Sequence, residues 1–189
     1  MNLAKNYIND KNIEWDKTCR FAFNDRSNPD DDELGIQIVK DLHRTGCSAF
    51  SGNENEFDRA MLKRVLLAYA RYNKQIGYCQ GFNIIAAFIL EIVDKKEEDA
   101  LLIMIFLMDS IIPNGYYTNS MHTLAIDMVV FRELLKLKIP KLYNHLNNLQ
   151  NNSSSNDNYE PPLTNVFTMQ WFLCIFATCL PKQLIIRIW

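Results

Sequence analysis

Arg44 and Gln80 are residues whose side chains can assist phosphoryl transfer without taking up a proton. A guanidinium group keeps its charge and can neutralise the charge that develops on a transferring phosphoryl group. A glutamine amide can hold an attacking water by accepting one of its protons while donating to a neighbouring oxygen. A nucleotide triphosphatase whose own hydrolysis is slow lacks these two groups, so a second protein could supply them in trans.

Gln80 lies within the stretch RYNKQIGYCQGFN, residues 71–83, between two segments of helical apolar spacing. Asn73, Gly77 and Gly81 are residue types that tolerate tight turns or a positive φ. The sequence therefore predicts a loop that presents an uncharged amide at its end.

Arg44 follows a predicted helix. Residues 28–33, NPDDDE, provide an N-cap candidate, a proline for the first turn and acids that favour the positive end of the helix dipole. Gly46 is a candidate stop signal, so Arg44 is expected where the helix ends. Asp41 precedes Arg44 by three residues, and spacing alone indicates an ordinary surface ion pair.

The rest of the chain also has helical rather than strand periodicity, which predicts an all-α fold. Residues 1–28 are polar with scattered aromatics and are expected to be a frayed segment that packs on the core. Residues 151–160 are expected to form a flexible polar loop. Helices are predicted over residues 56–72, 82–93, 100–112, 120–137, 140–149, 166–180 and from 181 onward.

Composition narrows the possible functions. A chain of 189 residues with 48% apolar and 22% charged residues fits one globular domain. The net charge of -2 and the lack of a basic run argue against a nucleic-acid partner. Five cysteines without a C-x-x-C pair, and three histidines outside any metal or nucleophile motif, predict no metal site and a reduced, cytoplasmic compartment. No P-loop or dinucleotide signature appears, so no cofactor of its own is expected.

Residues 161–181 carry no charge and are long enough to cross a bilayer. The run contains Asn165, Gln170 and three threonines, and it begins with two prolines. A buried core helix is therefore the favoured interpretation, and a membrane-inserted helix is the alternative.

Two motifs resemble those of the TBC domain family, the all-helical GTPase-activating proteins of Rab GTPases. Ile38-x-x-Asp41-x-x-Arg44, followed by Thr45, resembles the family's I-x-x-D-x-x-R motif, and Tyr78-Cys79-Gln80, followed by Gly81, resembles its Y-x-Q motif. The resemblance extends from about residue 32 to residue 189. Three segments further resemble one subgroup of the family: KDLHRTG, LLAYARYNK and YEPPLTNVFTMQWF.

The resemblance implies an irregular multi-helix bundle of the TBC type. Residues 1–189 would form one domain that comprises an N-terminal subdomain and the start of a C-terminal subdomain. The family's domain continues past the position of Trp189 with further helices, so a domain truncated at its C-terminus is expected.

Carried onto this chain, the resemblance implies that Arg44 is an arginine finger and Gln80 a glutamine finger. Asp41 would orient the Arg44 loop, and Tyr78 and Gly81 would shape the turn that presents Gln80. Ile38 and Thr45 are the remaining supporting positions of the motifs.

The implied partner is a Rab GTPase in its GTP form, and GTP and Mg²⁺ would belong to that partner. The chain would have no substrate turnover of its own, would regulate vesicle traffic and would not insert into membranes directly. It would be cytoplasmic, with membrane recruitment through the Rab or flanking regions. The alternative is a Rab-binding or scaffold module that does not accelerate hydrolysis.

Overall fold

The computed structural model describes residues 1–24, 29–42, 56–118, 120–153 and 162–189. All regular elements in these ranges are helical, which confirms the predicted all-α class. The chain divides into two compact units, Met1–Asn114 and Gly115–Trp189, which are described in turn.

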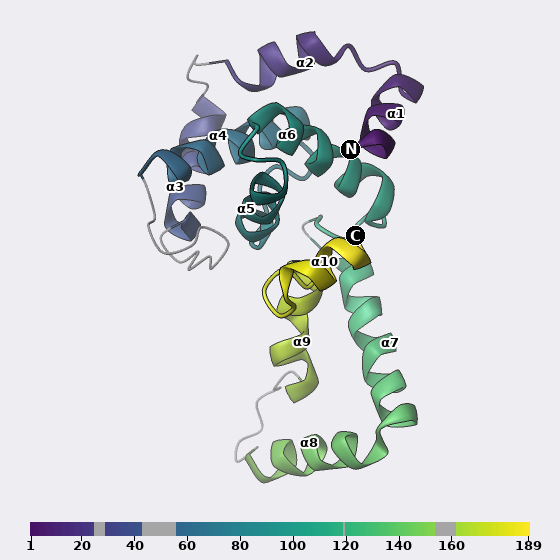
Figure 1. The fold of residues 1–189 in the computed structure, drawn as a ribbon. Helices are drawn as coiled ribbons and strands as arrows, with labels where there is room; N and C mark the ends of the chain where they lie inside the picture. The colour runs from purple at the N-terminus through teal and green to yellow at the C-terminus, as the bar shows by residue number, and fades with distance from the viewer. Residues whose placement is uncertain (25–28, 43–55, 119, 154–161) are drawn as a thin grey trace. The chain divides into compact units, whose positions relative to one another are not determined.

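Helix α4 (Glu56–Tyr72) is the centre of the first unit and has the bounds that its periodicity predicts. It packs against α2 (Trp15–Ala22), α3 (Pro29–Leu42), α5 (Phe82–Ile92) and α6 (Glu97–Phe106), as Figure 1 shows. Its buried face contains apolar side chains three or four residues apart, as an amphipathic helix requires. These side chains are Met61, Leu62, Val65, Leu66 and Tyr69.

Helices α5 and α6 complete the core of this unit. Eight of the eleven residues of α5 are buried, so only a narrow side of this helix faces solvent. Three acids in the first turn of α6, Glu97, Glu98 and Asp99, favour the positive end of its dipole. The helix continues as a π-helical turn, η1 (Leu107–Ile111), which places Asp109 beside the end of α4.

The first 24 residues contradict the expectation of a frayed end, because they contain α1 (Asn2–Asp10) and α2. Small and aliphatic side chains anchor these helices rather than the aromatics: Ala4 and Ala22 are each 1% exposed, whereas Phe21 is 54% exposed. Each helix is short and has only two buried residues, so its stability depends on tertiary packing.

The second unit contains α7 (His122–Lys138), α8 (Pro140–Ser153), α9 (Leu163–Leu173) and α10 (Lys182–Ile188). Helix α7 packs against α8 and α9 through a stripe that includes Leu124, Met128 and Leu135. The rings of Phe131 and Phe172 meet edge to face at 5.9 Å between centroids. The first three residues of the predicted loop 151–160 end helix α8 instead, and the rest of that loop lies outside the described residues.

The expected buried helix 166–180 is shorter and less buried than predicted. Helix α9 ends at Leu173, and Ile175 and Phe176 then adopt φ values of 48° and 63°. Thr164 and Thr168 are buried, while Val166 is 67% exposed. Thr168 remains satisfied in the interior because its hydroxyl donates to the Thr164 carbonyl oxygen at 2.6 Å. In the described part of the chain, no helix is long and apolar enough to cross a membrane.

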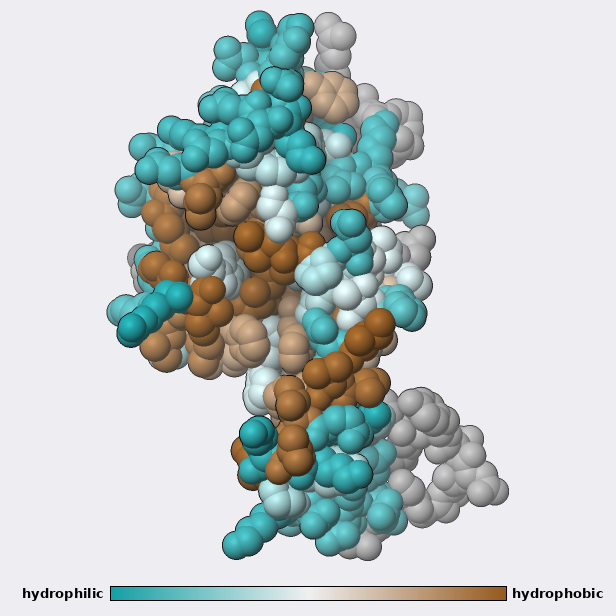
Figure 2. All heavy atoms as spheres, turned by 90° about the vertical axis from the view of Figure 1, so that its right-hand side faces the viewer, coloured by the Kyte–Doolittle hydropathy of each residue, from teal (hydrophilic) through white to brown (hydrophobic). Residues whose placement is uncertain are grey.

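A second apolar stripe runs along α7 at helical spacing but is exposed. It consists of Ile126, Val130, Leu134 and Leu137, which are between 48% and 72% exposed. Figure 2 shows hydrophobic side chains gathered in a band along this part of the molecule. Helix α7 is therefore apolar on two sides, of which the described residues bury one.

Candidate functional site

The predicted loop between α4 and α5 is present, and it begins with a turn that starts at Asn73. The Asn73 carbonyl oxygen accepts a hydrogen bond from the Gly77 amide at 2.8 Å, and its side-chain oxygen accepts one from the Ile76 amide at 3.2 Å. Gly77 has φ = 62°, a conformation that favours glycine. The chain therefore leaves α4 in a closed turn before it reaches Tyr78.

Gln80 is exposed and lies directly before Gly81, the N-cap residue of α5. Gly81 has φ = 99°, and its carbonyl oxygen accepts from the Ile84 and Ile85 amides at 3.1 Å each. This left-handed residue turns the loop into the helix. The amide of Gln80 thus belongs to an exposed side chain on a short, backbone-anchored turn.

Gly81→Ala is expected to cost about 1 to 2 kcal/mol of unfolding free energy, because a Cβ is disfavoured at this positive φ. Gly35→Ala is the matched control: Gly35 lies inside α3, and the nearest atom to an added Cβ is Lys63 Cε at 3.9 Å. This control should be neutral or stabilising by about 0.5 to 1 kcal/mol. Urea unfolding of both variants measures the contrast, and equal effects would contradict the conformational argument.

A hydrogen bond joins the two sequence motifs. The Tyr78 hydroxyl donates to Asp41 Oδ2 at 2.8 Å, which connects the loop before Gln80 to the last turn of α3. Tyr78 is 8% exposed, and its ring also meets Phe82 edge to face at 6.3 Å. Ile38, one turn before Asp41, is fully buried and anchors the same helix. Residues 37 positions apart in the sequence are therefore neighbours.

Of the seven predicted site residues, the structure thus brings together Asp41, Tyr78, Gln80 and Gly81, with Ile38 in the supporting core. Arg44 and Thr45 lie outside the described residues. Asp41 is one residue from the end of α3, and Arg44 is three residues further along the chain.

The described part of this site is uncharged apart from Asp41. Burial raises the pKa of the Cys79 thiol above its usual value, and the Asp41 charge raises it further. Cys79 therefore stays protonated at neutral pH and is a packing residue rather than a nucleophile. The chemistry available here is hydrogen bonding by the Gln80 amide, which can orient a water or an oxyanion.

Arg71, at the end of α4, is a structural residue. Its Nη1 atom donates to the carbonyl oxygens of Ala22 and Asn24, both at 2.7 Å. These carbonyls lie at the C-terminal end of α2, so the guanidinium group caps that helix. No local pattern could reveal this contact because the acceptors are 49 and 47 residues away.

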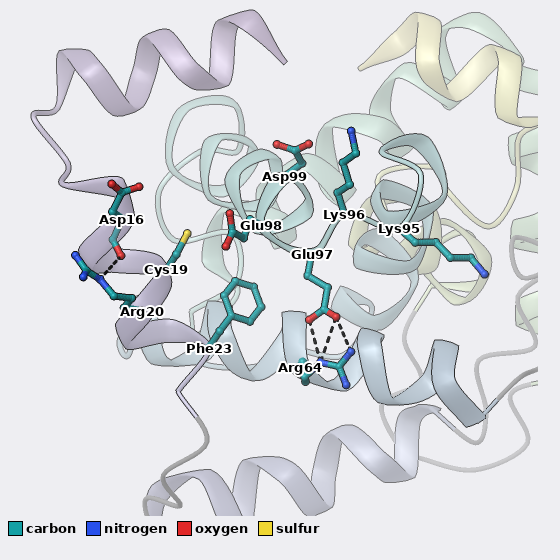
Figure 3. Close-up of a pocket in the computed structure, with 10 residues that line it drawn as sticks. All are labelled: Asp16, Cys19, Arg20, Phe23, Arg64, Lys95, Lys96, Glu97, Glu98 and Asp99. Carbon is teal, nitrogen blue, oxygen red and sulfur yellow. Dashed lines mark hydrogen bonds and ion pairs between the residues drawn. The ribbon is translucent and has the colours of Figure 1, made fainter.

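The first unit also contains a pocket of about 1060 Å³ that is separate from these motif residues. Side chains of α2, α4 and the start of α6 line it (Figure 3). Opposite charges are paired there, since Arg64 binds both carboxylate oxygens of Glu97, with Nε distances of 3.0 and 3.2 Å. Within the described ranges, no cluster of three histidine, cysteine or acidic residues could hold a metal ion.

Comparisons with known proteins identify the family of this chain. A sequence model of the Rab-GTPase-TBC domain matches residues 3–189. The chain is 61% identical to human TBC1 domain family member 30, and the alignment covers 100% of this chain and 21% of that protein. It is 33% identical to growth hormone-regulated TBC protein 1 of Xenopus tropicalis, covering 80% of this chain and 41% of that protein.

A solved structure supports the fold. The crystal structure of the Chlamydomonas flagellar RabGAP TBC domain matches with a TM-score of 0.69 at 22% identity, covering 96% of this chain and 55% of that chain. The chain thus spans about a fifth of the human relative's length and about half of the solved chain. The subgroup indicated by the three sequence segments is that of member 30, in agreement with the 61% identity. Together, the domain match, the close relatives and the helical fold establish that this chain belongs to the TBC domain family.

Proposed function

We propose that this chain is a GTPase-activating module for a Rab-family GTPase in its GTP form. The observation that carries the proposal is the Tyr78–Asp41 hydrogen bond, because it connects the Gln80 loop to the helix that leads to Arg44. Family membership supports the same conclusion. The exposed position of Gln80 supports it further, since an amide must be accessible to reach a partner's active site.

In the proposed mechanism, the partner supplies GTP and Mg²⁺, and this chain supplies two side chains. The Arg44 guanidinium neutralises charge that develops on the γ-phosphoryl group and its bridging oxygen. The Gln80 amide holds the attacking water in line, in place of the GTPase's own glutamine. The hydrogen bond from Tyr78 to Asp41 holds the two motifs next to each other, and Gly81 allows the turn that exposes Gln80.

The proposal includes a role in vesicle traffic, a cytoplasmic location and recruitment to membranes through the Rab. A module that binds a Rab without accelerating hydrolysis is the competing function. The two differ in one respect: a module that only binds requires neither an arginine nor a glutamine to reach the nucleotide.

Single-turnover GTP hydrolysis across a panel of Rab proteins tests the proposal. The chain and the longest natural polypeptide that contains it are each compared with their Arg44→Ala and Gln80→Ala variants. Acceleration of one or a few Rabs, lost in both variants, is the expected result. Binding to GTP-loaded Rabs with no acceleration by either polypeptide would instead identify a non-catalytic module.

Tyr78→Phe should lower Rab stimulation without unfolding the chain, because it removes only the hydroxyl that donates to Asp41. The expected loss of unfolding free energy is about 1.5 kcal/mol, the low end for a hydrogen bond to a charged group. Tyr117→Phe is the matched control, because its hydroxyl donates at 2.9 Å to the Leu173 carbonyl oxygen within the second unit, whereas both motifs belong to the first. Urea unfolding and hydrolysis rates are measured together. Equal losses of stimulation in both variants would show that the effect is one of general stability.

A further inference from the structure

Arg71 connects the segments that lead to the two sequence motifs. Its Nη1 atom donates to the carbonyl oxygens of Ala22 and Asn24, both at 2.7 Å. These carbonyls lie at the end of α2, and the next helix along the chain is α3, the helix of the first motif. Arg71 itself is the penultimate residue of α4, which the Gln80 loop follows. One side chain therefore attaches the approach to α3 to the approach to Gln80.

The physical setting of these two hydrogen bonds favours a firm attachment. A guanidinium donor forms charge-assisted hydrogen bonds, which are stronger than bonds between neutral groups. The acceptors lie at the C-terminal end of a helix, where carbonyls lack intrahelical partners and a positive charge is favoured. Ala22 is 1% exposed, so this end of α2 is packed into the core of the unit. Arg71 thus holds the last turn of α4 against a fixed part of the fold.

The Gln80 loop has a second attachment further along. The Tyr78 hydroxyl donates to Asp41 Oδ2 at 2.8 Å, two residues before Gln80. Between the two attachments the backbone is closed, because the Gly77 amide donates to the Asn73 carbonyl oxygen at 2.8 Å. A loop that is held at one end alone can pivot about that end. The place of Gln80 relative to α3 therefore depends on both attachments.

We propose that Arg71 is a positioning residue for Gln80, because it fixes the end of α4 from which the Gln80 loop starts. The inference rests on the proposed GTPase-activating function. An arginine that only capped α2 would affect the thermal midpoint and not the rate of hydrolysis with the folded protein. A positioning residue also affects that rate in the folded state, and only while Gln80 is present.

Three variants separate these roles. Arg71→Met keeps an apolar stem of similar length but removes the donors. Arg71→Lys keeps a nitrogen that can serve both carbonyls, since the two hydrogen bonds come from one atom and an ammonium group has three donors. Arg64→Met is the matched control, because Arg64 lies on the same helix and binds both carboxylate oxygens of Glu97.

The measurements are the saturating single-turnover rate on a responsive Rab, the apparent affinity for that Rab and the thermal midpoint, with rates taken well below every midpoint. Arg71→Met should lower the saturating rate about tenfold, because small displacements of a catalytic group reduce the rate steeply. The apparent affinity should change by less than about threefold. Arg71→Lys should keep at least about half of the wild-type rate, a rescue that a guanidinium acting on the nucleotide would not allow. Arg64→Met should match the wild type.

A double-variant cycle tests whether Arg71 acts through Gln80. In the Gln80→Ala background, Arg71→Met should change the residual rate by less than about twofold, because the group that Arg71 positions is already absent. Backbone hydrogen exchange gives a readout that needs no Rab. The Gly77 amide, which donates to Asn73, should exchange faster in Arg71→Met and at the wild-type rate in Arg64→Met.

A folded Arg71→Met that keeps the wild-type rate, or that loses only affinity, would overturn the inference. A further loss of about tenfold in the Gln80→Ala background would overturn it as well, since Arg71 would then act elsewhere. If Arg71→Met does not fold, Arg71→Lys decides, because a loss of about tenfold in that variant would contradict the expected rescue. If the wild-type chain accelerates no Rab, the proposed function itself fails, and exchange of the Gly77 amide still decides whether Arg71 fixes the loop.

Discussion

Arg44→Ala is expected to abolish measurable stimulation of Rab GTP hydrolysis while leaving the fold intact. An arginine supplied in trans contributes about 10³ to 10⁵ in rate to GTPases, because it neutralises charge that exists only in the transition state. The helix that leads to Arg44 is anchored by Ile38 and by the Asp41 hydrogen bond, neither of which requires the arginine. Single-turnover hydrolysis at saturating protein measures the rate loss, and circular dichroism confirms the helical content.

Arg44→Lys tests whether the positive charge alone is sufficient for stimulation. Lysine keeps the positive charge but lacks the planar fork of donors that a guanidinium presents to phosphoryl oxygens. It is therefore expected to fail as well, with a rate close to that of Arg44→Ala. Arg20→Ala, at an exposed position of α2, is the control for the loss of an arginine and should retain full stimulation. Near-normal rates for Arg44→Lys would show that Arg44 acts only as a charge.

Gln80→Ala should lose hydrolysis by a factor on the order of 10² or more, because the attacking water is no longer held in line. The variant should still form a complex with a Rab that carries GDP and a fluoride mimic of the phosphoryl group, since Arg44 remains. Stopped-flow hydrolysis and a binding assay on the mimic complex separate these two effects.

The same loop provides a matched control for this prediction. Gln75 is an exposed glutamine five residues earlier, outside the Y-x-Q motif. Gln75→Ala removes an identical amide and should keep the wild-type rate. If Gln80→Ala also kept that rate, Gln80 would have no part in the mechanism. If both variants lost activity equally, the loop's general stability would be the cause.

Much of the fold could be predicted from local pattern. Helix α4 has the predicted bounds because its apolar side chains face one core and recur every three or four residues. The loop before α5 was recognisable from Asn73, Gly77 and Gly81, which are suited to turns that other residues resist. The candidate site residues were predicted from two short motifs, each of which depends on few positions.

The structural features that local pattern did not predict depend on contacts between segments that are distant in the sequence. In the sequence, Arg71 is one more charged residue on an amphipathic helix. It caps α2 only because the fold brings the C-terminal end of α2 within hydrogen-bonding distance of its guanidinium group. The α9 segment was predicted to be buried because it is uncharged. Apolar composition does not determine which side of a helix faces the interior, and in α9 Thr164 and Thr168 are buried while Val166 is exposed. The hydrogen bond from Tyr78 to Asp41 likewise has no local signature.

That hydrogen bond also has a consequence for how this sequence can change over generations. A tyrosine hydroxyl and a carboxylate form a donor and an acceptor at 2.8 Å, so the loss of either one removes this hydrogen bond from the other. Substitutions at positions 41 and 78 should therefore covary among related sequences, even though 37 positions separate them. A descendant lineage that loses the aspartate would accumulate phenylalanine at position 78 without further penalty from this contact.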